Sequence, residues 1–134
     1  MSNYWVFMVT DHIGYRAETI FENRIKIGKW LLNSNARNFN NLRVGDLILF
    51  YIGGKSAKGY VGIGKLKSTP RLLETSKKTE FIGNLDPYFV EFEFLERFRM
   101  PLTTKEIGDD RLPQGSITAS DETHFQRIKL QCSR

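Results

Sequence analysis

The sequence is poor in residues that bind metals or form disulfides. Its 134 residues include one cysteine, Cys132, and two histidines, His12 and His124. A single cysteine cannot form an internal disulfide, and these three residues cannot supply the four Cys or His ligands of a structural zinc ion. We therefore expect neither a disulfide-stabilised scaffold nor a metal or other cofactor.

Long apolar runs are also missing. No segment approaches the ~20 apolar residues that span a bilayer, and Met1–Val9 has neither the basic start nor the small-residue cleavage site of a secretory signal. Disorder is excluded as well, because 40% of the residues are hydrophobic and 13% are aromatic. We therefore expect a single cytoplasmic domain that spans residues 1–134.

Catalytic motifs are lacking too. Gly59–Lys65 has the spacing of a phosphate-binding loop, but Leu66 follows where such a loop needs a Ser or Thr to hold magnesium. The adjacent Asp109 and Asp110 lie beside Arg111 in an irregular stretch without a companion acid or base. No set of nucleophile, base and oxyanion-stabilising group can be assembled, so the sequence predicts a protein that is not an enzyme.

Positive charge is present in modest excess and is unevenly distributed. The formal net charge is +5; residues 1–67 hold ten Lys and Arg against four Asp and Glu, whereas residues 68–134 hold ten against eleven. A basic half favours a polyanionic partner, because each neutralised phosphate releases counterions and adds affinity that does not depend on base sequence. The alternative is a basic surface that is simply solvated.

Four segments are predicted to be strands of one sheet system. Tyr4–Thr10 and Leu47–Ile52 are apolar on both alternating faces, which is typical of central strands. Gly59–Lys67 follows as the second arm of a hairpin. Tyr88–Met100 alternates so that its aromatic side chains share one face and its charged side chains the other.

Short helices are expected between and after these strands, whereas Ile25–Leu32 fits neither state clearly. Strands dominate and hairpins join them, so the sequence predicts an α+β fold, a small mixed β-barrel of about five to six strands with short flanking helices. The expected helices are Gly14–Asn23, Asn33–Leu42 with Ser34 as its N-cap, a turn at Thr103–Ile107, and a C-terminal helix that Thr118 or Ser120 caps.

Aromatic side chains near the hairpin are candidates for base stacking. Trp30 lies in a basic stretch, near Lys26 and Lys29, that shows no clear period, and Tyr51 and Tyr60 lie on the two strands of the hairpin. An aromatic wall at a barrel mouth can stack a base, which contributes ~1–3 kcal/mol per base. The alternative for Trp30 is a structural position that covers the end of the barrel.

Several of these segments together resemble the EVE domain, a member of the PUA-like group that also contains the YTH and ASCH domains. The most specific stretch is Asn35–Ser68, where a helix, "L-x-x-G-D", an apolar strand, a Gly turn and "VGIG" follow in this order. The resemblance covers nearly the whole chain and implies a PUA-like mixed β-barrel. The similar segments are YWVFMVT, Gly28-Lys29-Trp30, ARNFNNLRVGDLILFYIGG, GYVGIGKLKSTP and GSITASDETHFQRI.

The resemblance also implies a pocket for an extruded, chemically modified nucleobase. Trp30 would form one wall of an aromatic cage, with a partly exposed ring close to Tyr51 or to the Gly53–Gly54 backbone. The nucleobase-binding residues that it implies are Trp30, Tyr51, Gly53, Gly54, Gln114 and Ser116. From the uneven charge we expect the phosphate-binding residues on one face around the pocket mouth, namely Lys26, Lys29, Arg37, Lys55 and Lys58.

Three functions remain open. The first is a non-catalytic nucleic-acid-binding module that accommodates a flipped, methylated base such as methylcytosine in DNA, as the sensor of a modification-dependent restriction system with a fused or associated nuclease or motor. The second is an RNA-binding PUA-like module. The third is a small-molecule or protein-interaction domain in which Trp30 binds a metabolite. Strong salt dependence of binding would separate the first two from the third.

Overall fold

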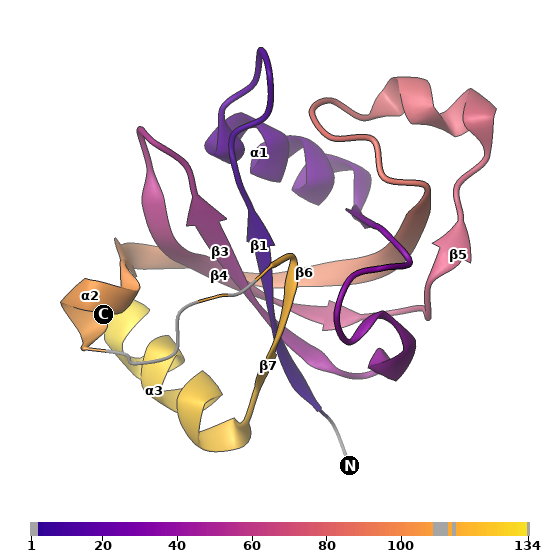
Figure 1. Cartoon of the computed structure of the whole chain (residues 1–134). Coiled ribbons are helices and arrows are strands. Elements are labelled where there is room, and N and C mark those ends of the chain that lie inside the picture. Colours follow the sequence, from indigo (N-terminus) through magenta and orange to yellow (C-terminus); the bar gives the residue numbers. More distant parts are fainter. Residues whose placement is uncertain (1–2, 109–112, 114, 134) are drawn as a thin grey trace.

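The structure, a computed structural model, describes residues 3–108, 113 and 115–133. This part of the chain forms one curled mixed sheet, with helices against it (Figure 1). The strands run in the order β2-β6-β4-β3-β1-β7, and β5 pairs with β6. The elements are β1 (Tyr4–Val9), α1 (Ala17–Ile27), β2 (Lys29–Leu32), η1 (Phe39–Asn41), β3 (Leu47–Gly53), β4 (Lys58–Leu66), β5 (Arg71–Leu72), η2 (Thr75–Glu80), β6 (Tyr88–Leu102), α2 (Thr104–Ile107), β7 (Ile117–Ser120) and α3 (Glu122–Cys132).

The predicted α+β class and the four predicted strands are confirmed, with one more strand than expected because β5 contributes a two-residue pairing to β6. None of the helices in the described ranges is long and apolar enough to cross a membrane.

β1 and β3 pair in parallel at the middle of the sheet. Phe7 and Phe50 point to one face, where they pack around Trp30. Val6 and Leu49 point to the opposite face, which α3 covers. Both faces of these strands are therefore buried, which explains why their sequences are apolar on both faces.

The helix expected at Gly14–Asn23 forms a few residues further on, as α1. Oδ1 of Asp11 accepts a hydrogen bond from the Ala17 amide at 2.8 Å, so that the side chain caps the helix from outside it. Gly28, in the left-handed conformation with φ 77°, ends it. The unassigned segment Ile25–Leu32 thus contains a helix end, a glycine cap and a strand. The buried face of α1 consists of Ala17, Ile20, Phe21 and Arg24, which recur at helical spacing.

The helix predicted for Asn33–Leu42 is wrong, and Ser34 caps nothing there. Only the 3-10 turn η1 forms, because Asn38 adopts a left-handed conformation with φ 71°. Oδ1 of Asn33 accepts a hydrogen bond from the Asn35 amide at 2.9 Å. Asparagine side chains that bond nearby backbone in this way compete with helix formation.

The predicted caps of the C-terminal helix are also wrong. Thr118 and Ser120 belong to β7, where they pair with β1. Asp121 caps α3, since its Oδ1 accepts a hydrogen bond from the His124 amide at 2.8 Å. The pairing with β1 is long-range, so no local pattern showed it. The expected turn at Thr103–Ile107 is confirmed as α2, which Thr103 opens with a capping box.

The alternation predicted for the long strand β6 breaks in its middle. Val90 and Phe92 face the first core cluster, around Trp30, but Phe98 faces the second cluster, under α3. The cause is a register shift against β4 beside Gly64. A β-bulge inserts an extra residue and turns the following side chains to the other face. Met100, expected on the buried face, is 50% exposed.

Candidate functional site

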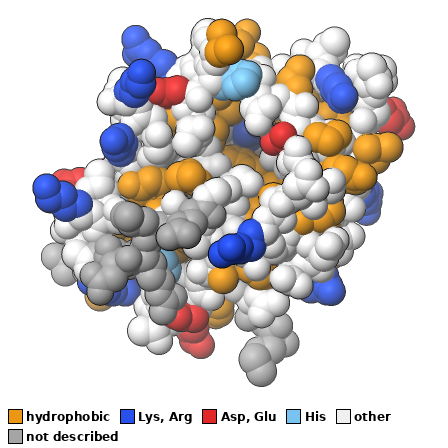
Figure 2. Space-filling model, in the orientation of Figure 1, with side chains coloured by type: hydrophobic (Ala, Val, Ile, Leu, Met, Phe, Trp, Pro, Cys, Tyr) orange, Lys and Arg blue, Asp and Glu red, His pale blue; other side chains and the backbone are white. Residues whose placement is uncertain are grey.

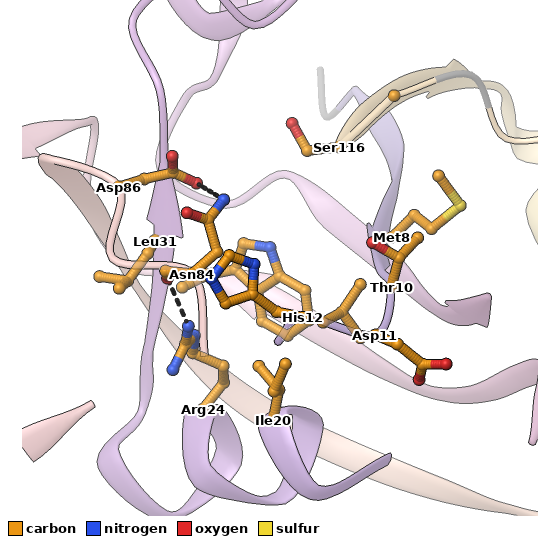
Figure 3. A pocket seen from close by; sticks show the side chains of 13 residues that line it. Met8, Thr10, Asp11, His12, Ile20, Arg24, Leu31, Asn84, Asp86 and Ser116 are labelled. Atoms are coloured by element: carbon orange, nitrogen blue, oxygen red, sulfur yellow. Dashed lines mark hydrogen bonds between the residues drawn. The ribbon is translucent and has the colours of Figure 1, made fainter. Parts of the chain in front are cut away.

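A pocket of about 240 Å³ lies where β1 ends (Figure 3). At ~30 Å³ per water molecule this space equals about eight waters, the scale of one flat heterocycle. Figure 2 shows apolar side chains exposed near the middle of this face, with Lys and Arg side chains at separate places around it. The lining comes from five segments: residues 8–12, Ile20 and Arg24 of α1, Trp30 and Leu31 of β2, Asn84 and Asp86 before β6, and Gly115 and Ser116 before β7.

Trp30 lines this pocket, but its ring is not partly exposed as predicted. Only 3% of the residue is exposed, because the pairing of β2 with β6 turns the indole into the barrel interior. Four phenylalanines from four different elements surround it. The ring centroids of Phe50, Phe7, Phe21 and Phe92 lie 5.1, 5.9, 6.2 and 6.2 Å from that of Trp30. Trp30 is therefore both a core residue and a small part of the pocket wall.

Arg24 brings a buried positive charge to the pocket. It is 4% exposed, and its guanidinium lies 5.2 Å from the Phe81 ring centroid. Nη1 donates to Oδ1 of Asn23 at 2.6 Å and Nη2 to the Asn84 carbonyl at 3.0 Å. Burial lowers the pKa of Arg24 to about 10, against the opposing effect of the Asp86 carboxylate. The guanidinium therefore stays protonated at neutral pH, and it holds the loop before β6 in place.

Asp86 adds a half-buried carboxyl group on the same side of the pocket. Oδ2 accepts a hydrogen bond from Nδ2 of Asn84 at 3.3 Å. Burial raises the pKa of Asp86, whereas the nearby Arg24 charge and the Asn84 hydrogen bond favour the ionised form. Within the described ranges no ion pair joins Asp86 to Arg24. The carboxylate therefore keeps acceptor capacity that no contact with the described residues uses.

Asp11 lies at the opposite side of the pocket in Figure 3, and each of its carboxylate oxygens accepts a hydrogen bond from a backbone amide. Its Oδ1 accepts from the Ala17 amide at 2.8 Å and its Oδ2 from the Lys55 amide at 3.0 Å. These two bonds lower the pKa of Asp11. They also join the start of α1 to the β3–β4 hairpin, and so they shape one wall of the pocket.

The structure brings together only part of the predicted base-binding set. Ser116 lines the pocket with Trp30, whereas Gln114 lies outside the described residues. The ring of Tyr51 is not in the pocket: it packs on Tyr60, centroid to centroid 4.8 Å, in the cluster on the far face of the sheet. The physical reason is the side-chain alternation of β3, which sends Phe50 inward and Tyr51 outward.

Gly53 and Gly54 lie behind the pocket wall rather than in it. A side chain on Gly54 would reach within 2.6 Å of Oδ1 of Asp11, and one on Gly53 within 3.4 Å of Sδ of Met8. Asp11 and Met8 both line the pocket. The two glycines therefore leave space for Asp11 and Met8, and neither glycine lines the pocket itself.

The predicted basic residues stand outside the pocket lining. Lys55 and Lys58 lie in the β3–β4 hairpin and are exposed, as is Lys26 in the last turn of α1. Nζ of Lys29 lies 5.2 Å from the Phe89 ring centroid, and Arg37 is exposed in the loop after β2. These residues belong to different segments of the chain, and the basic face around the pocket mouth stays a prediction.

Sequence reasoning missed the polar groups of the pocket. Asn84 and Asp86 precede the predicted strand Tyr88–Met100 and belong to no motif, and Arg24 shares the helical spacing of the buried Ala17, Ile20 and Phe21. A cation on the inward face of a helix is the one signal that was available, because a buried charge requires partners. Among the described residues no cluster of three or more His, Cys, Asp or Glu side chains could hold a metal ion.

This curled mixed sheet with short helices has the α+β fold of the PUA-like group, as comparison with known structures shows. The chain belongs to the EVE domain family, whose model matches residues 3–128. The resemblance drawn from the sequence is therefore confirmed.

Solved structures with the same fold are similar over nearly their whole length. Human THYN1, solved in complex with DNA that contains 5-methylcytosine, has a TM-score of 0.64 and 16% identity, over 99% of this chain and 99% of that one. The YTH domain of Zygosaccharomyces rouxii MRB1, solved with N6-methyladenosine RNA, has a TM-score of 0.60 and 11% identity, over 98% and 88%. A hypothetical protein from Leishmania major has a TM-score of 0.63 and 19% identity, over 98% and 94%. At these identities the likeness shows the fold.

A curated protein also matches in sequence. Glucose-6-phosphate isomerase of Prochlorococcus marinus (strain MIT 9312) is 30% identical over 110 residues, which are 78% of this chain and 20% of that protein. The chain thus spans about a fifth of the length of this relative.

Proposed function

We propose that this domain binds nucleic acid without catalysing a reaction and takes one extruded, modified base into the pocket beside Trp30. The observation that carries the proposal is the pocket itself, about 240 Å³ with both apolar and polar side chains in its lining. Two proteins of the same fold, human THYN1 and the MRB1 YTH domain, were solved with methylated DNA and methylated RNA. Both complexes support the proposal.

The energies show which contacts must carry the binding. A buried methyl group contributes ~0.8 kcal/mol, about fourfold in affinity, whereas extrusion of a base costs a few kcal/mol. Phenylalanines cover most of the Trp30 ring, so stacking on it provides less than a free indole would. Hydrogen bonds from the polar groups of the pocket and phosphate contacts therefore supply most of the affinity, and the methyl group tunes selection.

The phosphate contacts are assigned to the basic residues outside the pocket. They lie on the β3–β4 hairpin, at the end of α1, on β2 and in the following loop. Each phosphate neutralised makes binding more salt-dependent. The residues are Lys26, Lys29, Arg37, Lys55 and Lys58.

A binding panel tests the function. Matched DNA and RNA oligonucleotides, with cytosine or 5-methylcytosine and with adenine or N6-methyladenine, are titrated by fluorescence anisotropy. Binding should prefer a methylated strand, and five phosphate contacts should weaken it by about a hundredfold or more between 50 and 200 mM salt. Affinity that hardly changes with salt would instead support the small-molecule or protein-interaction alternative.

Two variants locate the binding. Ser116→Trp fills the pocket without a change of charge, and it should abolish discrimination between methylated and plain strands. Leu130→Trp places the same side chain at a 67% exposed position on α3 and should bind like the wild type. Unchanged discrimination in Ser116→Trp would show that another surface reads the base.

RNA is the second candidate ligand, because the MRB1 YTH domain has this fold and was solved with modified RNA. The same panel decides between the two nucleic acids, since only RNA offers the 2′-hydroxyl. If the domain prefers methylated DNA, we further propose that it is the sensor of a modification-dependent restriction system. Its test is copurification with a nuclease or motor.

A further inference from the structure

Two hydrogen-bonding residues lie together on one side of the pocket. Figure 3 shows Asn84 and Asp86 on that side, with Met8, Thr10 and Asp11 on the other. The apolar part of the lining includes Met8, Ile20 and Leu31. A flat base packed against these apolar side chains would turn one edge toward the loop before β6, which carries Asn84 and Asp86.

The Asp86 carboxylate on this side of the pocket can accept further hydrogen bonds. An ionised carboxylate offers about four acceptor sites, and Asn84 uses one, through Oδ2 at 3.3 Å. Among the described residues none donates to Oδ1. In the described part of the chain Arg24 forms no ion pair with Asp86, and its Nη1 and Nη2 donate to the Asn23 side chain and the Asn84 carbonyl.

The loop that carries Asp86 is held in place. Nη2 of Arg24 donates to the Asn84 backbone at 3.0 Å, a contact between residues 60 positions apart in the chain. Asn23 anchors the preceding stretch, because its Oδ1 accepts from the Ile82 amide at 3.3 Å. The carboxylate is thus presented from a fixed backbone, as a specificity contact requires.

We propose that Asp86 makes the pocket selective for bases that carry an exocyclic amino group, as cytosine and adenine do, over the keto bases thymine and uracil. The inference rests on the proposed function and names the class of base. An amino group donates to the free carboxylate oxygen, whereas a carbonyl would set two acceptors against each other. Contacts of this kind, such as Asp or Glu accepting from N4 of cytosine, discriminate by about ten- to a hundredfold.

The ligand pair 5-methylcytosine and thymine isolates this contact. Thymine is 5-methyluracil, so both bases carry the same methyl group and differ at the amino or keto position. Each is placed opposite an abasic site in the same DNA duplex, which removes the difference in pairing energy. The wild-type protein should bind 5-methylcytosine about ten- to a hundredfold more tightly. A strand with 5-methylpyrimidin-2-one, which lacks the amino group and adds no bulk, should also bind more weakly than 5-methylcytosine.

Asp86→Asn tests the residue. An amide can turn either its oxygen or its nitrogen toward the base, so the preference should fall below about threefold while binding persists. Glu93→Gln is the matched control, because it also removes one negative charge, at an exposed position of β6, and should keep the full preference.

The outcomes separate the two proposals. Equal binding of 5-methylcytosine and thymine by the wild type, or an Asp86→Asn variant that keeps the preference, would overturn the role of Asp86 and leave the base-binding function standing. Binding of no oligonucleotide would overturn the function itself. If Asp86→Asn fails to fold, the comparison of the three bases on the wild-type protein still decides whether the amino group is read.

Discussion

The indole nitrogen of Trp5 donates a hydrogen bond to Oδ2 of Asp46 at 2.8 Å, across 41 positions of sequence. Both residues are buried, at 5% and 2% exposed. Asp46 also accepts from the backbone amides of Asn3, at 3.1 Å, and Arg43, at 2.9 Å. One carboxylate thus ties β1 to the turn before β3. The aspartate of the "L-x-x-G-D" motif is a structural residue.

Asp46→Ala should destabilise the domain by about 2–4 kcal/mol, because three donors lose their acceptor and one of them is a buried indole. Urea denaturation measures the free energy of unfolding. Trp5→Phe is the comparison, since it removes one donor and leaves the two backbone bonds intact. A loss under 1 kcal/mol in Asp46→Ala would mean that water replaces the carboxylate.

Trp30→Ala should cost about 3–5 kcal/mol of stability, as removal of a large core side chain does. The reason is the four phenylalanine rings that close on the indole. Trp30→Phe should cost less, because it leaves an aromatic ring in contact with Phe50. Thermal unfolding of both variants checks this order. A small loss in Trp30→Ala would indicate that the ring is far more solvent-exposed than its 3% suggests.

Gly64→Ala should destabilise the domain by about 1–3 kcal/mol through overpacking. A Cβ atom there would lie 2.7 Å from Cε2 of Phe50, in a core that cannot give way. The Phe50 ring therefore occupies the space that the missing side chain of Gly64 leaves. Gly53→Ala is the control, since its nearest neighbour would be Sδ of Met8 at 3.4 Å. Equal stability of the two variants would contradict this account.

The Asp11 carboxylate makes the contact between the start of α1 and the β3–β4 hairpin weaken at low pH. Its pKa is lowered below the ordinary 3.8 by hydrogen bonds from the Lys55 and Ala17 amides. The stability that it contributes is therefore complete above about pH 3.8 and is lost as the pH falls through the lower folded value. In an NMR titration, the Ala17 and Lys55 amide signals should move together with a midpoint below 3.8. Asp11→Asn should remove this titration, and a midpoint at or above 3.8 would refute the assignment.

Local pattern predicted the strands well but assigned side chains to faces less reliably. In β6 the alternation predicts one aromatic face, yet the bulge beside Gly64 of β4 sends Phe98 to the other cluster. In the same way, Asn38 and the Asn33 side chain prevented the helix that Ser34, as a candidate N-cap, predicted. Both differences arise from pairings and turns that depend on residues outside the local window.

The candidate site was predictable only in part. Trp30 and Ser116 came from the family resemblance, and both line the pocket. Arg24, Asn84 and Asp86 escaped notice, because two distant segments meet only when β2 pairs with β6 and the loop before β6 folds over α1. Tyr51 does not line the pocket because side chains alternate along β3. Phe50 points into the cluster around Trp30, so Tyr51 points to the opposite face of the sheet.

By itself the sequence determined the family, the α+β class and four strands of the sheet, because apolar alternation and glycine turns act over a few neighbouring residues. Only the tertiary structure decided that Trp30 is buried, that Tyr51 faces away, and that the carboxylate of Asp86 stands at the edge of a pocket. Such positions depend on strand register and on contacts between residues tens of positions apart, such as Arg24 with Asn84. A pattern of neighbouring residues carries no information about these contacts.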